Sequence, residues 1–276
     1  MIDQLAKAKT FQALHDQGCF FIPNPWDVGS AKLLTGLGFQ ALATTSSGFA
    51  HSTGVNDYEL TRSQVIDHVR DLCASTPLPV SADLENGFGH SPEDCAETIT
   101  LGAQAGLVGG SIEDFSGTPG ELYPIGHAKD RIAAAVEAAR ALPYPFMLTA
   151  RAENLFTGDG DLRDAIARLQ AYQEAGADVL YAPGLRTLDD IKSVLASVDR
   201  PVNVLLGPKE GLRPASDLAE LGVRRISVGG ALANVAMDAI VKAGRELLGS
   251  GTFGFLSGVS PAAEITDLMF RHSPRD

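Results

Sequence analysis

The sequence predicts an α/β protein that folds as a single (β/α)8 barrel of the TIM type. Short apolar runs alternate with segments of helical periodicity, which is typical of parallel βα units. There are eight such runs, the strand number of this barrel, and they cover residues 19–23, 39–45, 79–85, 107–114, 145–151, 178–183, 201–207 and 225–230. Recurring residues at the boundaries of the runs point to the same fold.

Glycine and proline mark these boundaries in an alternating pattern. A glycine ends the helix before runs two, four, six and eight, where a left-handed residue is expected; these are Gly38, Gly106, Gly176 and Gly222. A proline opens runs three, five and seven, as suits the first position of a strand; these are Pro79, Pro145 and Pro201. A doubly wound sheet would also alternate strands and helices, but no GxGxxG turn follows residue 27.

Several helices can be placed from their first residues. Thr61 followed by Gln64 forms the pattern of a capping box, and Ser91 precedes a proline at the first helical position. Asp161 stands before a segment with apolar residues at helical spacing. The N-terminal residues 1–18 are predicted to form an amphipathic helix.

The length of 276 residues fits one barrel domain. We expect residues 1–248 to form the barrel with its N-terminal helix, and residues 249–276 to form a loop and one last helix outside it. With 45% hydrophobic and 20% charged residues, the chain can bury a large core and is not of the disordered class.

Composition also narrows the function. A net charge of −12 argues against nucleic acid as a partner, since that binding depends on clustered Lys and Arg. No stretch approaches the roughly 20 apolar residues of a membrane span, so we predict no membrane partner. The three cysteines have no CxxC spacing, which favours a reducing, cytoplasmic location.

Acidic residues gather at the ends of runs three and four. The active site of a barrel lies at the carboxyl ends of its strands, where this chain places Asp83, Glu85, Glu113 and Asp114. Strand alternation predicts that Asp83 and Glu85 point to the same side. Carboxylates at close range need a cation or protons, and Mg²⁺ suits an all-oxygen set. Each acid taken singly could equally cap a helix or solvate a loop.

Arg151 ends the apolar fifth run and needs a carboxylate partner. That partner is either a substrate or a structural neighbour such as Glu153 or Glu113. After run two, Thr45, Ser46, Ser47 and Gly48 offer small side chains and backbone N–H groups that could hold an anion, or they form an ordinary tight turn. Asn203 in run seven could face the barrel interior or bond to core backbone.

The connection at residues 115–127 is long for a βα loop and rich in glycine and proline. It is either a lid that closes over the site or a rigid surface excursion. The sequence contains no HExxH pair, so nothing in it indicates a zinc site. No lysine ends any of the eight runs, which argues against a Schiff-base aldolase.

Three motifs carry a resemblance to a known superfamily. SADLENGFG (81–89), SIEDF (111–115) and TARAEN (149–154) follow one another on predicted strands three, four and five. With the segment from PNPWDVGSA (23–31) to GGALA, they resemble the isocitrate lyase / phosphoenolpyruvate mutase superfamily. The resemblance covers most of the chain.

The resemblance implies roles for individual residues. It makes Asp83 a direct metal ligand, with Glu85 and Glu113 as ligands through water, and it adds Asp57 in GVNDYELT to the site. Together with the strand positions, it assigns catalysis to Arg151, Asp57 and Glu113, and substrate binding to Thr45, Ser46, Ser47, Gly48, Asp83, Arg151 and Asn203. It further implies Mg²⁺, with Mn²⁺ as a substitute, and a homotetramer built as a dimer of dimers, with the last helix exchanged between neighbours.

The predicted function is a Mg²⁺-dependent lyase that acts on a small α-oxo acid and breaks the bond to C3, leaving a metal-stabilised enolate. Residues 115–127 contain neither the lysine nor the cysteine of the KKCGH lid of the lyases. They also lack the lysine- and asparagine-bearing lid of the phosphonate-forming mutases. Carbon–carbon cleavage, as in oxaloacetate decarboxylase or 2-methylisocitrate lyase, is favoured over carbon–phosphorus chemistry, for which few cations beyond Arg186 and Lys209 are available. A non-catalytic 2-oxo acid binder is the remaining alternative.

Overall fold

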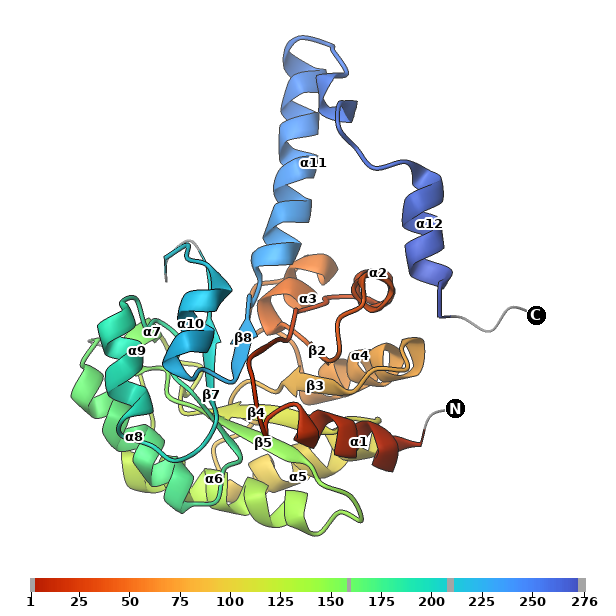
Figure 1. Ribbon diagram of the computed structural model, residues 1–276. Helices are drawn as coiled ribbons and strands as arrows, with labels where there is room; N and C mark the ends of the chain where they lie inside the picture. Colours follow the sequence, from red (N-terminus) through yellow and green to blue (C-terminus); the bar gives the residue numbers. More distant parts are fainter. Residues whose placement is uncertain (1–2, 158–159, 208–210, 273–276) are drawn as a thin grey trace.

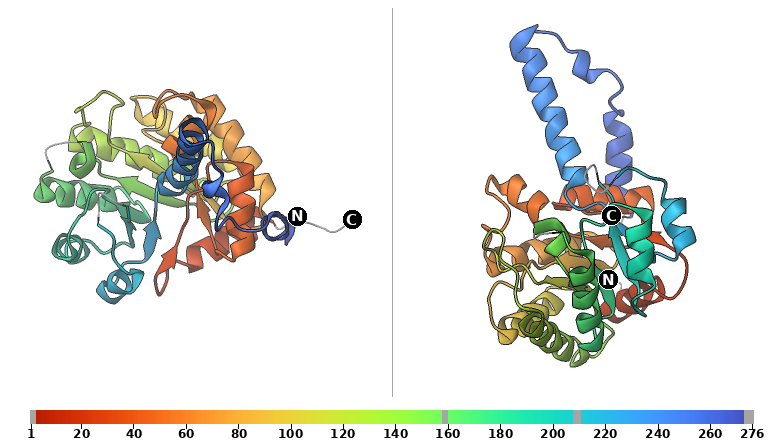
Figure 2. Two further views of the ribbon diagram at one scale, coloured as in Figure 1. Left: turned by 90° about the horizontal axis from the view of Figure 1, so that it is seen from above. Right: turned by 90° about the vertical axis from the view of Figure 1, so that its left-hand side faces the viewer.

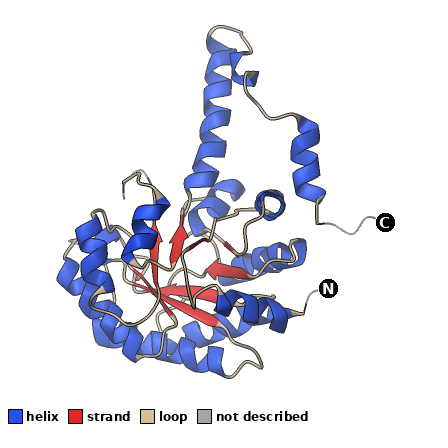
Figure 3. Cartoon of the chain, viewed as in Figure 1, coloured by secondary structure: helices blue, strands red, loops and turns tan. Residues whose placement is uncertain are grey.

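A computed structural model describes residues 3–157, 160–207 and 211–272. Its centre is one sheet of eight parallel strands surrounded by helices (Figures 1 and 3). The strands are β1 Phe20–Phe21, β2 Leu42–Ala43, β3 Val80–Asp83, β4 Gly109–Glu113, β5 Met147–Arg151, β6 Val179–Tyr181, β7 Val202–Leu205 and β8 Arg225–Ser227. Each lies inside one of the eight predicted runs, so the TIM-type (β/α)8 prediction is confirmed.

The sheet curls on itself to form the barrel. Its strand order is β1-β8-β7-β6-β5-β4-β3-β2, which leaves β1 and β2 at the two ends. Backbone and side-chain bonds join these ends: the N–H of Ala43 donates to the carbonyl of Pro23 at 3.1 Å, and Nδ2 of Asn24 donates to the carbonyl of Thr44 at 3.0 Å. These bonds close the wall of the barrel between β1 and β2.

The helices surround this sheet. They are α1 Gln4–Ala13, α2 Val28–Leu37, α3 Ser46–Thr53, α4 Arg62–Ser75, α5 Pro92–Gln104, α6 Ile125–Arg140, α7 Asn154–Thr157, α8 Leu162–Glu174, α9 Leu188–Leu195, α10 Ala215–Leu221, α11 Ala231–Gly249 and α12 Ala262–Phe270, with a 3₁₀ turn at Gly254–Leu256. The predicted caps are present, including the capping boxes at Thr61 and Ser91 and the left-handed glycines Gly38 and Gly222.

The third run ends earlier than predicted, and this corrects one expectation about the site. β3 stops at Asp83, whose Oδ1 accepts the N–H of Glu85 at 3.2 Å. The chain therefore turns, and Glu85 takes a left-handed backbone with φ of 48°. Strand alternation does not extend to Glu85, so its direction is set by this turn.

The amino-terminal end of the barrel is closed by α1. Its Phe11 packs with Phe20, Met147 and Val179, which lie at or near the starts of β1, β5 and β6. His15 lies directly after this helix, with its ring edge-on to Phe11 and Phe20, and its Nδ1 bonds to the carbonyl of Phe11 at 2.8 Å. Among the described residues, this packing covers the amino-terminal end of the barrel, opposite the carboxyl ends of the strands.

The C-terminal segment leaves the barrel and returns to it. Helix α11 stands away from the barrel, and α12 runs back beside it (Figures 1 and 2). α12 packs on α2 so closely that a side chain at Gly36 would collide with the carbonyl of Leu268, and Arg271 donates to the carbonyl of Gly36 at 2.8 Å. The exchange of this segment between subunits and the division of the domain at residue 248 remain predictions.

No helix within the described residues is long and apolar enough to cross a membrane. The cytoplasmic location remains a prediction.

His15 should make stability depend on pH. Burial, followed by the charge of Arg225, lowers the pKa of His15 to about 3, whereas a histidine in the unfolded chain has a pKa near 6.5. Between these two pH values only the unfolded state binds the proton. The free energy of unfolding should therefore decrease by up to about 1.4 kcal/mol for each unit by which the pH is lowered. Urea unfolding from pH 7.5 to 5 should give a shallower pH dependence for His15→Phe than for the wild type. The exposed His51→Gln control should keep the wild-type dependence, and parallel curves for all three proteins would contradict the assignment.

Candidate active site

A cavity of about 280 Å³, lined in part by polar and charged side chains, opens inside the barrel at the carboxyl ends of the strands, where barrel enzymes place their active sites. Among the residues that line it are Thr45, Ser46, Ser47, Asp57, Tyr58, Asp83, Arg151, Tyr181, Asn203, Arg225 and Ser227. Six of the predicted site residues therefore line the same cavity as Asp83. Glu85, Glu113 and Gly48 lie outside this lining.

Arg151 is the centre of the site. Its guanidinium forms ion pairs with Asp83 at 2.8 Å, with Glu153 at 2.9 Å and with Glu113 at 3.1 Å. It also lies over the ring of Tyr181, 5.2 Å from the centroid. The structural neighbours predicted for Arg151 are thus present, and Asp83 joins them.

The strand register explains this cluster. Glu113 and Arg151 are the last residues of β4 and β5 and stand opposite each other in the sheet, while Asp83 is the last residue of β3. Burial raises the pKa of Glu113, and it raises that of Glu153 to about 7. Burial alone would lower the pKa of Arg151, but Asp83, Glu153 and Glu113 outweigh it and hold the guanidinium charged.

Asp57 and Glu85 lie near Asp83 and form a second acidic group with it. Burial and the charge of Asp83 raise the pKa of Asp57, and burial followed by Asp83 and Asp57 raises that of Glu85 to about 8. Oδ1 of Asp57 is buried and has no hydrogen-bond partner. Mutual repulsion and an unsatisfied oxygen are what a bound cation would relieve.

The donor set fits Mg²⁺ better than an all-protein metal cage. No three acidic, histidine or cysteine side chains converge on one point within the described part of the chain. Mg²⁺ keeps several waters and takes one or two carboxylates directly, so Asp83 with Asp57 and Glu85 around it suffices. Glu113 is directed elsewhere, because its Oε1 accepts the hydroxyl of Tyr58 and its Oε2 faces Arg151.

The segment after β2 is the first turn of a helix, which corrects the alternative of a tight turn. α3 starts at Ser46, and the hydroxyl of Thr45 caps it by accepting the N–H of Gly48 at 3.3 Å. Ser46 donates its hydroxyl to Oδ2 of Asp83 at 3.1 Å. A helix N-terminus favours anions, so Ser46 and Ser47 present this end to the cavity.

Gly48 contributes packing and does not line the cavity. A side chain there would collide with Thr45 and press on Trp26 and Ala233. Its role is the close approach of α3 to its neighbours, with its N–H used by the Thr45 cap.

Asn203 faces the barrel interior, as one of its two alternatives predicted. Its Nδ2 donates to Oγ of Ser227 at 3.0 Å, and its Oδ1 accepts from Nε of Arg225 at 2.8 Å. Asn203 therefore bonds to polar side chains of the cavity.

The connection after β4, for which a lid and a rigid excursion were the two alternatives, is held in place by its own bonds. Phe115 and Leu122 form an antiparallel bridge, and Ser116 bonds to Glu121 through both backbone and side chain. Tyr123 is buried, and α6 begins at Ile125, so the connection is shorter than the predicted 115–127. These contacts favour the rigid alternative over a mobile lid.

Several polar residues of the lining were not predicted, among them Tyr58, Tyr181, Arg225 and Ser227. Tyr58 has a left-handed backbone with φ of 66°, and the residues around it in the sequence do not predict this conformation. For Arg225 the signal was present, because a charged residue opens an otherwise apolar run. Arg225 was not predicted because it opens its run, whereas most of the predicted site residues lie at or just after the ends of runs.

The family comparison agrees with this geometry. The sequence model of a family described as phosphoenolpyruvate phosphomutase matches residues 11–248. An uncharacterised protein of Mycobacterium tuberculosis is 33% identical over 247 residues, with 86% of this chain and 88% of that protein covered. An oxaloacetate decarboxylase of Chromohalobacter salexigens is 29% identical over 238 residues, with 83% and 80% covered.

A solved structure from Burkholderia cenocepacia J2315 is similar throughout. It is 52% identical, has a TM-score of 0.94, and covers 98% of this chain and 97% of its own. Its description goes no further than a lyase or mutase. The predicted resemblance and the prediction of an enzyme are confirmed at this level.

Removing the charge of Arg151 should destabilise the protein strongly. Arg151→Met would leave Asp83, Glu113 and Glu153 without their shared cation, at a cost of about 3–5 kcal/mol. The check is the free energy of unfolding in urea without added metal. Arg70→Met, which breaks an exposed pair with Asp67, should cost at most about 1 kcal/mol. Equal costs for the two variants would show that Arg151 is not the centre of the cluster.

Proposed function

Since the chain belongs to the phosphoenolpyruvate phosphomutase family, within the isocitrate lyase / phosphoenolpyruvate mutase superfamily, we propose that it is a Mg²⁺-dependent lyase that breaks the bond to C3 of a small α-oxo acid. One observation carries the proposal. Arg151, the acidic group around Asp83 and the N-terminus of α3 meet in a single cavity at the carboxyl end of the barrel. An oxo acid presents a carboxylate and a carbonyl, and this cavity offers groups suited to both.

The residues divide the work of binding. Ser46 and Ser47 at the start of α3 would hold the substrate carboxylate, because N–H groups and the helix dipole favour an anion there. Asp83, with Asp57 and Glu85, would hold Mg²⁺ or Mn²⁺. When bound, the ion would supply a Lewis acid that polarises the 2-oxo group.

Arg151 would stabilise charge as it develops on the oxo acid. In oxaloacetate the C3–C4 bond breaks, its electron pair forms the enolate of pyruvate, and the carboxylate leaves as CO₂. C3 then takes a proton from solvent. A guanidinium fixed by three carboxylates needs no rearrangement during this step, which is the favourable case for electrostatic catalysis.

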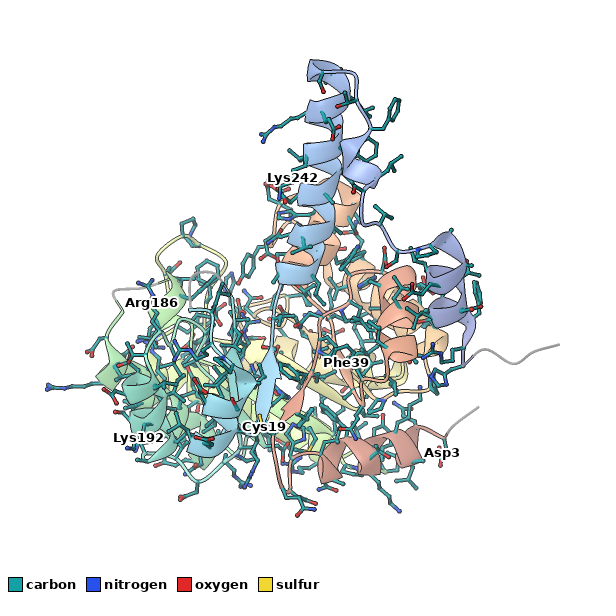
Figure 4. The ribbon with its side chains drawn as sticks, turned by 45° about the horizontal axis from the view of Figure 1, so that its top comes forward. Asp3, Cys19, Phe39, Arg186, Lys192 and Lys242 are labelled. Atoms are coloured by element: carbon teal, nitrogen blue, oxygen red, sulfur yellow. The ribbon has the colours of Figure 1, made fainter. Side chains whose placement is uncertain are left out.

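Carbon–carbon cleavage is better supported than carbon–phosphorus cleavage. The relative from Chromohalobacter salexigens is an oxaloacetate decarboxylase. Of the two cations named for a phosphoryl group, Arg186 is exposed in the loop after β6 and lines a different pocket (Figure 4). Lys209 lies outside the described residues. Decarboxylation also needs no cysteine on the connection after β4, so oxaloacetate is the first substrate to test.

Purified protein with Mg²⁺ should convert oxaloacetate, or a related 2-oxo or 2-hydroxy acid, to a product seen by mass spectrometry. The panel is oxaloacetate, 2-methylisocitrate, isocitrate and phosphonopyruvate. Chelation of the metal and Asp83→Asn should each lower turnover more than about 100-fold, because both remove the ion. Asp189→Asn on the exposed side of α9 should leave turnover unchanged.

Other results of the same assay would point elsewhere. Product from phosphonopyruvate alone would establish carbon–phosphorus cleavage. Thermal stabilisation by Mg²⁺ and oxo acids without any product would identify a non-catalytic 2-oxo acid binder.

We also propose that the protein is a homotetramer, a dimer of dimers in which neighbours exchange the C-terminal segment, so that the packing of α12 on α2 seen within one chain would form between two chains. α11 exposes Val235, Ile240 and Leu248 to 68%, 72% and 92%. Apolar side chains exposed along one projecting helix are typical of an interface. Lys242 lies on the projecting part of α11 (Figure 4) and forms an ion pair with Asp238 of the same helix.

Light scattering should give four times the mass of the chain for the wild type. Ile240→Glu combined with Leu248→Glu should lower that mass, because two charges would be buried in the interface without partners. Lys242→Ala, on the same helix, should keep the wild-type mass. A wild-type monomer would exclude the tetramer.

A further inference from the structure

A second arginine lies deep in the same cavity. Arg225 is the first residue of β8, is 5% exposed and faces the barrel interior. Its Nε donates to Oδ1 of Asn203 at 2.8 Å and its Nη2 donates to Oγ1 of Thr149 at 3.0 Å. Its Nη1 is buried and has no hydrogen-bond partner.

The charge of Arg225 is not balanced as that of Arg151 is. Arg151 contacts three carboxylates, whereas both acceptors of Arg225 are neutral and no acidic side chain of the described chain pairs with it. Burial lowers the pKa of Arg225 to about 10, with Tyr181 offsetting part of the effect. The guanidinium therefore stays charged at neutral pH, and an uncompensated buried charge is costly.

The neighbours of Arg225 fix it and leave one side for a ligand. Asn203 is oriented by its bond to Ser227, so its oxygen remains on Arg225. His15, below it, is neutral because burial and then Arg225 itself lower its pKa to about 3. It supplies no negative charge. Ser227 and Tyr181 line the cavity beside Arg225 and offer hydroxyl groups.

We infer that Arg225 binds a second anionic group of the substrate, so that the enzyme selects α-oxo acids carrying a negative charge beyond C2. The cavity is continuous from Asp83 and Arg151 to Arg225, so one small molecule can reach both arginines. A water molecule could bond to Nη1 but would not neutralise the charge. This inference rests on the proposed function, because it presumes that the oxo acid end binds at Asp83.

The test compares two ligands that differ in one charge. 3-Sulfopyruvate has a fixed negative group on C3 that neither decarboxylation nor phosphoryl transfer removes. 4-Methyl-2-oxopentanoate replaces a carboxylate by an isopropyl group of similar shape. Calorimetric titration with Mg²⁺ should show the wild type binding 3-sulfopyruvate roughly 10- to 100-fold more tightly, as expected for a charge-assisted hydrogen bond.

Two variants assign this preference to Arg225. Arg225→Met should bind both ligands about equally, with its affinity for 4-methyl-2-oxopentanoate unchanged. Arg225→Lys should keep part of the preference, because it keeps the charge and loses the fork. Arg224→Met is the matched control, since this neighbour donates to the carbonyl of Gly18 outside the cavity and should keep the full preference. Near-UV circular dichroism checks that each variant is folded.

The outcomes separate this inference from the proposed function. Equal binding of the two ligands by the wild type, or a preference that survives in Arg225→Met, would overturn the inference and leave the metal and oxo acid site intact. Binding of neither ligand with Mg²⁺ would overturn both. If Arg225→Met does not fold, the preference of the wild type for 3-sulfopyruvate and the weaker preference of Arg225→Lys still test whether Arg225 binds the second anionic group. Competition by oxaloacetate and by phosphonopyruvate then ranks a carboxylate against a phosphoryl group as the natural occupant.

Discussion

The guanidinium of Arg151 holds three carboxylates from three parts of the barrel rim, and the shape of the cavity depends on this cluster. Asp83, Glu113 and Glu153 could not all be buried and charged side by side without it. A buried ion pair is weak evidence for net stability, but it fixes where each oxygen lies. Asp83 is thereby placed against the first turn of α3, where Ser46 donates to it, and Asp57 and Glu85 complete the acidic group.

The two arginines of the cavity have different electrostatic surroundings, so the two ends of the cavity suit different chemical groups. Arg151 is neutralised by the protein and borders the acidic group that suits a cation. Arg225 is bonded only to neutral groups and retains an unsatisfied N–H. A ligand with a chelating end and a separate negative end would match both ends.

Much of the fold follows from local sequence signals. Apolar runs, capping residues and left-handed glycines act over a few positions, so all eight strands and the starts of several helices could be predicted. The meeting of Asp83, Arg151 and Ser46 also followed, because parallel strands end at one rim. Side-chain directions did not. The backbone turns at Glu85, whose N–H donates to Asp83, while Glu113 bonds to Tyr58 and Gly48 serves packing. The turn at Glu85 is local but replaces the expected strand, whereas the directions of Glu113, Gly48 and Arg225 depend on residues distant in sequence.

The most direct test of a metal and oxo acid site at Asp83 is a crystal structure of the protein with Mn²⁺ and oxalate. Anomalous scattering locates Mn²⁺ independently of the protein model, and oxalate stands in for the carboxylate and 2-oxo oxygens of an α-oxo acid. The account predicts one strong anomalous peak in the barrel cavity beside the carboxylate of Asp83, with oxalate next to it. An empty cavity at saturating Mn²⁺, or a peak bound to other residues, would contradict it.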